Sequence, residues 1–179
     1  MPRKNEFKLD VISVRLAKGA PLLSEHRIIS PKDAIDVIGK ELCEMDREVL
    51  CVINLKTDGT PINCHFASMG AINQAIAHPR ELFKSSILSN AANVILIHCH
   101  PSGSLQPSKE DTIITDRMAQ VCDLIGIPLL DHIIVAGDNS MHFSFKERGV
   151  MPNPFHSYHS DYRTLDIDSP MVAEKGKKR

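Results

Sequence analysis

The sequence predicts one α/β domain in which helices flank a mixed β-sheet. Three observations lead to this prediction. Segments with helical spacing of apolar residues alternate with short apolar, β-branched runs, and an Asp-Gly pair joins two of these runs. The 179 residues are 42% hydrophobic, which suffices for one core. Alternation with helices predicts parallel strands and the Asp-Gly turn predicts an antiparallel hairpin, so we expect a sheet that contains both.

The first half of the chain is expected to form a strand, a helix and a hairpin. Residues 6–16 alternate apolar and polar side chains, as a half-buried strand does. Residues 30–45 begin with Ser-Pro, a cap followed by proline at the first helical position, and their apolar residues share one helix face. Residues 49–55 and 61–67 flank KTDGT, whose Asp-Gly pair predicts a tight turn.

The second half is expected to alternate helices and strands. Residues 78–93 contain a proline near their start and have helical spacing, and VILIH at 94–98 is typical of a strand covered on both faces. A helix of about five turns is predicted from Ser108 to the stop signal at Gly126. Residues 129–136 and the segment MHFSF, which follows a GDNS turn, predict two further strands.

These elements predict three regions along the chain. Residues 1–29 are expected to form an N-terminal strand and a linker, and residues 30–150 the folded domain. Residues 151–179 have no sustained period, three prolines and a basic end, so we expect a flexible tail there. A second sizeable domain is not expected.

Charge and cysteine content narrow the classes of function. Lysine plus arginine number 21 against 22 aspartate plus glutamate, so charge does not imply nucleic-acid binding, although a local basic patch would still permit it. No apolar run has more than five residues, far fewer than the roughly 20 of a membrane helix. No signal sequence and no C-x-x-C pair is present, which favours reduced thiols in the cytoplasm. The cysteines are Cys43, Cys51, Cys64, Cys99 and Cys122.

The stretch HCHPSGSLQPSKED, residues 98–111, contains the candidate metal ligands. Side chains alternate across a strand, so His98 and His100 can point to one side while Cys99 points to the other. One ion could then contact both imidazoles. An H-x-H pair alone is weak evidence, because either histidine could be a satisfied polar residue at a strand end.

Asp111 strengthens the metal interpretation. It lies three positions after Ser108, in the first turn of the predicted helix, where the helix N-terminus favours a carboxylate. Capping alone would account for both residues, since Ser-x-x-Asp resembles a capping box. Together with the two histidines, however, Asp111 provides the third of three ligands suited to zinc and leaves a fourth position for water.

The spacing resembles the motif of the JAMM, or MPN-type, zinc metalloprotease domains and, within them, of the bacterial RadC-like proteins. That motif has an upstream glutamate, H-x-H, seven residues, serine, two residues and aspartate, and residues 98–111 match it without a gap. Several segments of residues 30–150 also look like RadC-type segments in the same order, among them DREVLCVINLKTDGTPI, HPRELFKSSILSNAANVILIH and LLDHIIVAG. The resemblance implies a cytidine-deaminase-like JAB/MPN fold.

The resemblance also implies a role for each residue of the motif. His98, His100 and Asp111 would hold Zn²⁺, which lowers the pKa of its bound water and polarises the substrate carbonyl. Ser108 would donate a hydrogen bond to the oxyanion of the tetrahedral intermediate. Glu48, directly before an apolar strand, is in the place of the family's general base, which takes a proton from the water and returns it to the leaving amine.

Other residues compete for some of these roles. Glu41 and Glu44, in the preceding helix, are alternative candidates for the base, although such acids are by default solvated surface charges. Asp131 or His132 could support a ligand imidazole, and a buried structural pair is an equally good interpretation. Five further histidines lack ligand-like spacing and are expected to be structural or on the surface. They are His65, His78, His142, His156 and His159.

Two features depart from the RadC pattern. The family commonly has asparagine between the histidines, where this chain has Cys99. Its thiol should not be a ligand, but it could alter local hydrogen bonding or make the site sensitive to oxidation. Full-length RadC-like proteins also carry an N-terminal helix-hairpin-helix domain linked with DNA, and the first 30 residues here are too short and too strand-like to form one.

Three functions follow from these observations. The first is a zinc-dependent metallohydrolase, a metallopeptidase or isopeptidase that cleaves an amide bond in a peptide or isopeptide substrate. The alternatives are a non-catalytic partner-binding module on the same fold and a DNA repair-associated accessory factor. Other H-x-H enzymes fit worse, because a TIM-barrel amidohydrolase needs about 250 residues and zinc deaminases require H-x-E with P-C-x-x-C.

Overall fold

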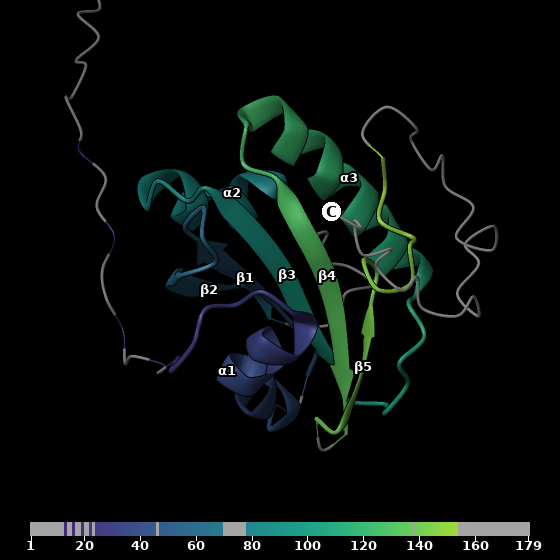
Figure 1. The fold of residues 1–179 in the computed structure, drawn as a ribbon. Helices are drawn as coiled ribbons and strands as arrows, with labels where there is room; N and C mark the ends of the chain where they lie inside the picture. The colour runs from purple at the N-terminus through teal and green to yellow at the C-terminus, as the bar shows by residue number, and fades with distance from the viewer. Residues whose placement is uncertain are drawn as a thin grey trace, which may run out of the picture.

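The structure is a computed structural model that describes residues 24–45, 47–69, 78–137 and 139–153, with isolated positions at 13, 16, 19 and 22. Within this part of the chain, helices and strands alternate after an initial helix and hairpin (Figure 1). The elements are α1 (Pro31–Cys43), β1 (Val49–Leu55), β2 (Pro61–Met69), α2 (Pro79–Leu88), β3 (Asn93–His100), α3 (Lys109–Ile125), β4 (Leu129–Ala136) and β5 (Met141–Ser144).

The five strands form one mixed sheet in the order β2-β1-β3-β4-β5. Strands β3 and β4 are parallel and are connected by α3, whereas the other neighbouring strands are antiparallel. The β1–β2 hairpin turns at Gly59, whose φ of 82° lies in the left-handed region that glycine tolerates. The predicted α/β class with a mixed sheet and flanking helices is therefore confirmed, and the architecture is consistent with a JAB/MPN-type fold.

Helices cover the two faces of the sheet differently. Helix α1 packs on one face, where Ile35, Ile38 and Leu42 contact odd-numbered β3 residues such as Ile97. Helices α2 and α3 pack on the other face, which carries the even-numbered residues of β3, among them Leu96. Figure 1 shows α1 in front of the sheet and α3 behind it. Strand β3 is consequently covered on both sides, as its apolar run predicted.

Local signals explain where the helices begin and end. Helices α1 and α3 start with capping boxes at Ser30 and Ser108, and α3 stops at Gly126, which has a left-handed φ of 68°. The helix predicted at residues 78–93 is shorter than expected. It ends at Leu88 because Asn90 adopts a positive φ of 52° and the chain then turns into β3.

Two predicted regions fall almost entirely outside the described residues. They are the strand at residues 6–16 and the tail at residues 151–179, so both stay predictions, as do the domain boundaries drawn from them. The five cysteines are free thiols. Among the helices that the structure describes, none is both long and apolar enough to cross a membrane.

Candidate metal centre

The end of β3 presents the two histidines of the H-x-H pair. The register pairs His98 with Leu50 of β1 and with Ile134 of β4, so its side chain lies on the face covered by α2 and α3. His100, two residues on, points to the same side. Both are buried, with exposed fractions of 1% and 5%. A tight turn follows, in which the Gly103 N–H donates to the His100 carbonyl at 3.0 Å, and the chain leads into α3.

The start of α3 presents the carboxylate of Asp111. The Ser108 N–H and the Ser108 hydroxyl both donate to Asp111 Oδ2 at 2.7 Å, and the Asp111 N–H donates to Ser108 Oγ at 3.1 Å. The expected capping box is thus present, and it holds the carboxylate at the helix N-terminus, where negative charge is favourable. Capping and metal binding are compatible here, because the box leaves Oδ1 free to face the histidines.

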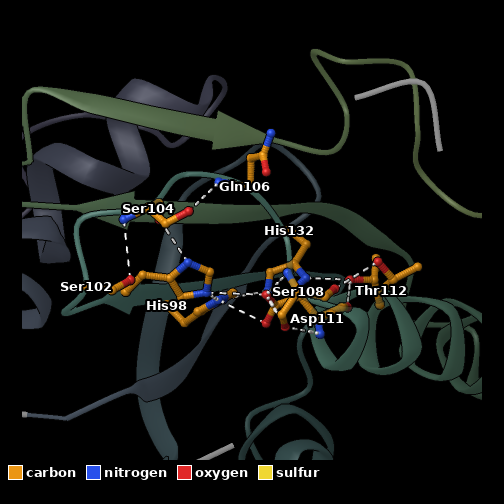
Figure 2. A network of polar contacts seen from close by, with 10 residues as sticks. His98, Ser102, Ser104, Gln106, Ser108, Asp111, Thr112 and His132 are labelled. Carbon is orange, nitrogen blue, oxygen red and sulfur yellow. Dashed lines mark hydrogen bonds and ion pairs between the residues drawn. The ribbon is translucent and has the colours of Figure 1, made fainter. Parts of the chain in front are cut away.

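The three side chains converge on one point, and Figure 2 shows His98 and Asp111 close together there. His98 Nε2 lies 2.9 Å from His100 Nε2 and 3.1 Å from Asp111 Oδ1, and His100 Nε2 lies 3.3 Å from Asp111 Oδ2. Two ligands about 2.05 Å from a zinc ion at a tetrahedral angle would lie about 3.3 Å apart. The observed separations are at or slightly below this value, so the geometry fits a single small cation.

The chemistry of the donor atoms also fits a cation. The His100 Nδ1–H donates to the Ser104 carbonyl at 2.9 Å, so its Nε2 presents a lone pair to the centre. Burial would raise the pKa of Asp111, but its contacts with His100 and His98 outweigh burial and hold this pKa well below its usual range. Burial lowers the pKa of His100, whereas the hydrogen bond and the charge of Asp111 raise it, with a net increase. The site therefore attracts positive charge, as two imidazoles and a carboxylate do for zinc and other first-row divalent ions.

Cys99 lies on the opposite face of the sheet from the two histidines. Its Sγ is 3.7 Å from Sγ of Cys43, at the end of α1, and it belongs to the apolar core under that helix. Burial raises the pKa of the Cys99 thiol to about 12. The thiol is therefore protonated and directed away from the candidate ligands.

Glu48 lies at the edge of the centre. It directly precedes β1, and the β1–β3 register, continued by two residues, brings it opposite His100. It is partly buried, and its charge is one of the contributions that raise the pKa of His100. The alternatives Glu41 and Glu44 belong to α1 and its C-cap, on the other face of the sheet. Of the three acids, Glu48 is the one placed beside the histidines.

The structure separates the two residues that could support a ligand imidazole. His132 on β4 contacts the site, because its Nε2 lies 2.9 Å from His98 Nδ1. Asp131 instead accepts hydrogen bonds from the Ser144 hydroxyl at 2.6 Å and from the Lys146 N–H at 3.0 Å. Burial raises the pKa of Asp131 to about 6, against the lowering effect of these bonds.

Sequence reasoning missed two contacts of the site. Thr115 Oγ1 lies 2.5 Å from His132 Nδ1, and the Ser104 carbonyl accepts a hydrogen bond from His100 Nδ1. Thr115 follows Asp111 by four residues and therefore lies on the same helix face, which was a usable signal. The Ser104 contact involves only the backbone, so residue type carries no signal for it.

The five histidines without ligand-like spacing lie away from the centre where the structure describes them. His78 caps α2 by accepting a hydrogen bond from the Arg80 N–H, and His142 contacts Glu147 at 3.0 Å. His65 lies on β2, which is separated from β3 by β1. His156 and His159 fall outside the described residues.

Comparisons with known proteins agree with this fold. The profile of the RadC-like JAB domain matches residues 28–150. A UPF0758 protein of Clostridium beijerinckii is 41% identical over 128 residues, which cover 72% of this chain and 55% of the relative. UPF0758 proteins of Rubrobacter xylanophilus and Salinibacter ruber are 39% and 40% identical over 140 and 125 residues, covering 78% and 70% of this chain.

The chain spans a little over half the length of these curated relatives, between 53% and 58%. The shared part is the folded region that carries the H-x-H pair and the start of α3. We conclude that this chain belongs to the RadC-like JAB domain family.

Proposed function

We propose that this protein is a zinc-dependent hydrolase that cleaves an amide bond in a peptide or isopeptide substrate. The observation that carries the proposal is the convergence of His98, His100 and Asp111 on one buried point, with Glu48 and Ser108 beside them. The relatives are named only for their family, so the proposal depends on the chemistry of the site. The free thiols support a reducing compartment such as the cytoplasm.

Bound zinc would activate a water molecule and polarise the substrate carbonyl. Glu48, on the β1 side of His100, would accept a proton from that water as its oxygen bonds to the carbonyl carbon. It would then give the proton to the nitrogen as the carbon–nitrogen bond breaks. The products are a carboxylic acid and an amine, so no oxidant or further reactant is required.

Ser108 would donate a hydrogen bond to the oxygen of the reacting carbonyl. Its hydroxyl donates to Asp111 Oδ2, but the Ser108 N–H donates to the same oxygen at the same distance of 2.7 Å. The hydroxyl can therefore turn toward a substrate while the backbone N–H keeps the carboxylate in place. Such a donor is worth about 10²- to 10³-fold in rate where it stabilises an oxyanion.

The test is hydrolysis by Glu48→Gln, with Glu44→Gln as the matched control. Glu44 is an exposed acid at the end of α1, on the other face of the sheet. Zinc-loaded proteins would be assayed on fluorogenic peptides and on peptides branched through a lysine isopeptide bond. We expect Glu48→Gln to bind zinc like the wild type and to lose roughly 10²- to 10⁴-fold in kcat, while Glu44→Gln keeps wild-type rates.

Three results would count against the proposal. Hydrolysis that survives removal of zinc by a chelator would exclude a metal mechanism. Equal rates for Glu48→Gln and the wild type would remove the assigned base. A zinc-loaded wild type that cleaves neither class of peptide would favour a partner-binding module on the same fold.

A further inference from the structure

A chain of hydrogen bonds runs behind His98, through residues outside the JAMM motif. The Thr115 Oγ1 lies 2.5 Å from the backbone carbonyl oxygen of Asp111 and 2.5 Å from His132 Nδ1. The other ring nitrogen of His132, Nε2, lies 2.9 Å from His98 Nδ1. Figure 2 shows His132 between the end of α3 that carries Asp111 and the ring of His98. Thr115 and His132 are fully buried, each with 0% exposure.

The Asp111 carbonyl oxygen, at one end of this chain of hydrogen bonds, fixes the direction of every bond in it. A carbonyl oxygen can only accept, so the Thr115 hydroxyl must donate to the Asp111 carbonyl. The Thr115 oxygen then accepts from His132, which must carry its proton on Nδ1. Nε2 of His132 is left as a lone pair, and it accepts from the Nδ1–H of His98.

The consequence reaches the metal centre. With its proton on Nδ1, His98 presents the Nε2 lone pair to Asp111 Oδ1 and His100 Nε2, which are 3.1 Å and 2.9 Å away. The chain of bonds also closes on itself, because it starts at the Asp111 backbone and ends beside the Asp111 carboxylate. His98 and Asp111, two of the three candidate ligands, are thus held by one closed set of contacts.

Packing holds the His132 ring in the orientation that these bonds require. The ring stacks on Phe145, with centroids 5.2 Å apart and an angle of 9° between the planes. The Phe145 N–H donates to the His132 carbonyl at 3.0 Å, and the His132 N–H donates to Asp131 Oδ1 at 2.7 Å. A flip of the His132 ring would have to break this stack, and both rings are buried.

We propose that Thr115 and His132 are positioning residues of this metal centre, which set the tautomer of His98 and thereby direct its Nε2 at the ion. The inference depends on the zinc site of the proposed function, and it adds a determinant of zinc affinity that lies outside the ligand set. Partners of this kind typically contribute 10- to 100-fold in metal affinity.

The first test measures the affinity of the apoprotein for zinc alone, by competition with a chromophoric chelator. Thr115→Val removes the hydroxyl at nearly constant volume, so in the zinc-bound state the His132 Nδ1–H has no acceptor. In the metal-free variant the His132 proton can move from Nδ1 to Nε2, so this cost does not arise. We therefore expect zinc to bind roughly 10- to 100-fold more weakly, with little change in the unfolding temperature of the apoprotein.

Two variants serve as controls. Thr115→Ser keeps the hydroxyl and should restore affinity to within about threefold of the wild type. Thr112→Val removes the other threonine hydroxyl of α3, which donates to the Ser108 carbonyl four residues earlier at 3.1 Å. Within the described part of the chain, this hydroxyl makes no hydrogen bond to an imidazole. Thr112→Val should bind zinc as the wild type does. Equal zinc affinity for Thr115→Val and Thr112→Val would overturn the proposal.

A second measurement needs no variant. Long-range ¹H–¹⁵N spectra of the zinc-loaded wild type report which ring nitrogen of each histidine carries the proton. We expect Nδ1–H for His132, and a proton on its Nε2 would overturn the proposal. A wild type that binds no zinc would defeat both this inference and the proposed function, whereas normal affinity for Thr115→Val would defeat the inference alone.

Discussion

Two buried carboxylates, Asp111 and Asp131, lie in very different surroundings. Asp111 faces two imidazoles at the start of α3, and its contacts with them outweigh burial and keep its pKa well below the usual range. Asp131, near the start of β4, accepts hydrogen bonds from neutral donors, and burial dominates and raises its pKa to about 6. The difference shows that burial alone does not define a metal ligand. A carboxylate that stays charged beside two imidazoles can bind a cation, whereas one that accepts hydrogen bonds from hydroxyl and backbone donors supports the fold.

The largest expected contrast is in metal binding. Asp111→Asn keeps the shape of the side chain but removes its charge, so zinc affinity should fall by more than the roughly 100-fold that loss of an outer partner costs. Asp131→Asn is the matched variant and should still bind one zinc per chain. Isothermal titration with zinc measures both. Equal losses in the two variants would contradict the assignment of Asp111 as the ligand.

The next contrast is in the dependence of stability on pH. The pKa of Asp131 is about 6 in the folded protein and 3.8 in its ordinary state, so the folded chain binds the proton more tightly between these values. This contribution to stability is fully present below pH 3.8 and is lost as the pH rises through about 6. The difference between the two pKa values corresponds to about 3 kcal/mol.

Urea unfolding of the apoprotein at several pH values tests this expectation, with Asp131→Asn as the reference. The free energy of unfolding of the wild type, relative to Asp131→Asn, should decrease by roughly 2 to 2.5 kcal/mol from pH 4 to pH 7, because part of the contribution is already lost at pH 4. A difference that is constant over this range, or that increases with pH, would show that Asp131 stays charged in the folded protein.

The smallest effect is expected at Cys99, which is adjacent to both histidines in sequence but lies on the other face of β3. Cys99→Ala should change zinc affinity by less than about threefold, because the thiol contacts Cys43 under α1. Its cost should be a loss of stability of about 1 kcal/mol from the core. A tenfold loss of zinc affinity would mean that the thiol acts on the site through the strand.

Sequence patterns predicted the elements whose signals are local. The capping residues Ser30 and Ser108 mark the starts of α1 and α3, and Gly59 marks the hairpin turn. The alternation of side chains along a strand also predicted that His98 and His100 share a face. The predicted end of α2 was five residues too late, because Asn90, rather than a glycine, takes the left-handed conformation that ends the helix.

Other features depend on contacts between distant segments. The neighbourhood of Glu48 and His100 follows from the register of β1 against β3, which no local pattern specifies. The pairing of Thr115 with His132 requires that α3 cross back over β4, 17 residues later in the sequence. Residue types suggested that His132 or Asp131 supports a ligand, but only the fold shows that His132 is the one in contact with His98.

The central claim is that His98, His100 and Asp111 share one metal ion. Anomalous scattering at the zinc absorption edge, from crystals of the zinc-loaded protein, tests it most directly. We predict a single strong peak about 2.0 to 2.2 Å from Nε2 of both histidines and from an oxygen of Asp111. A peak at another location, or these three side chains turned apart around an empty position, would contradict the claim.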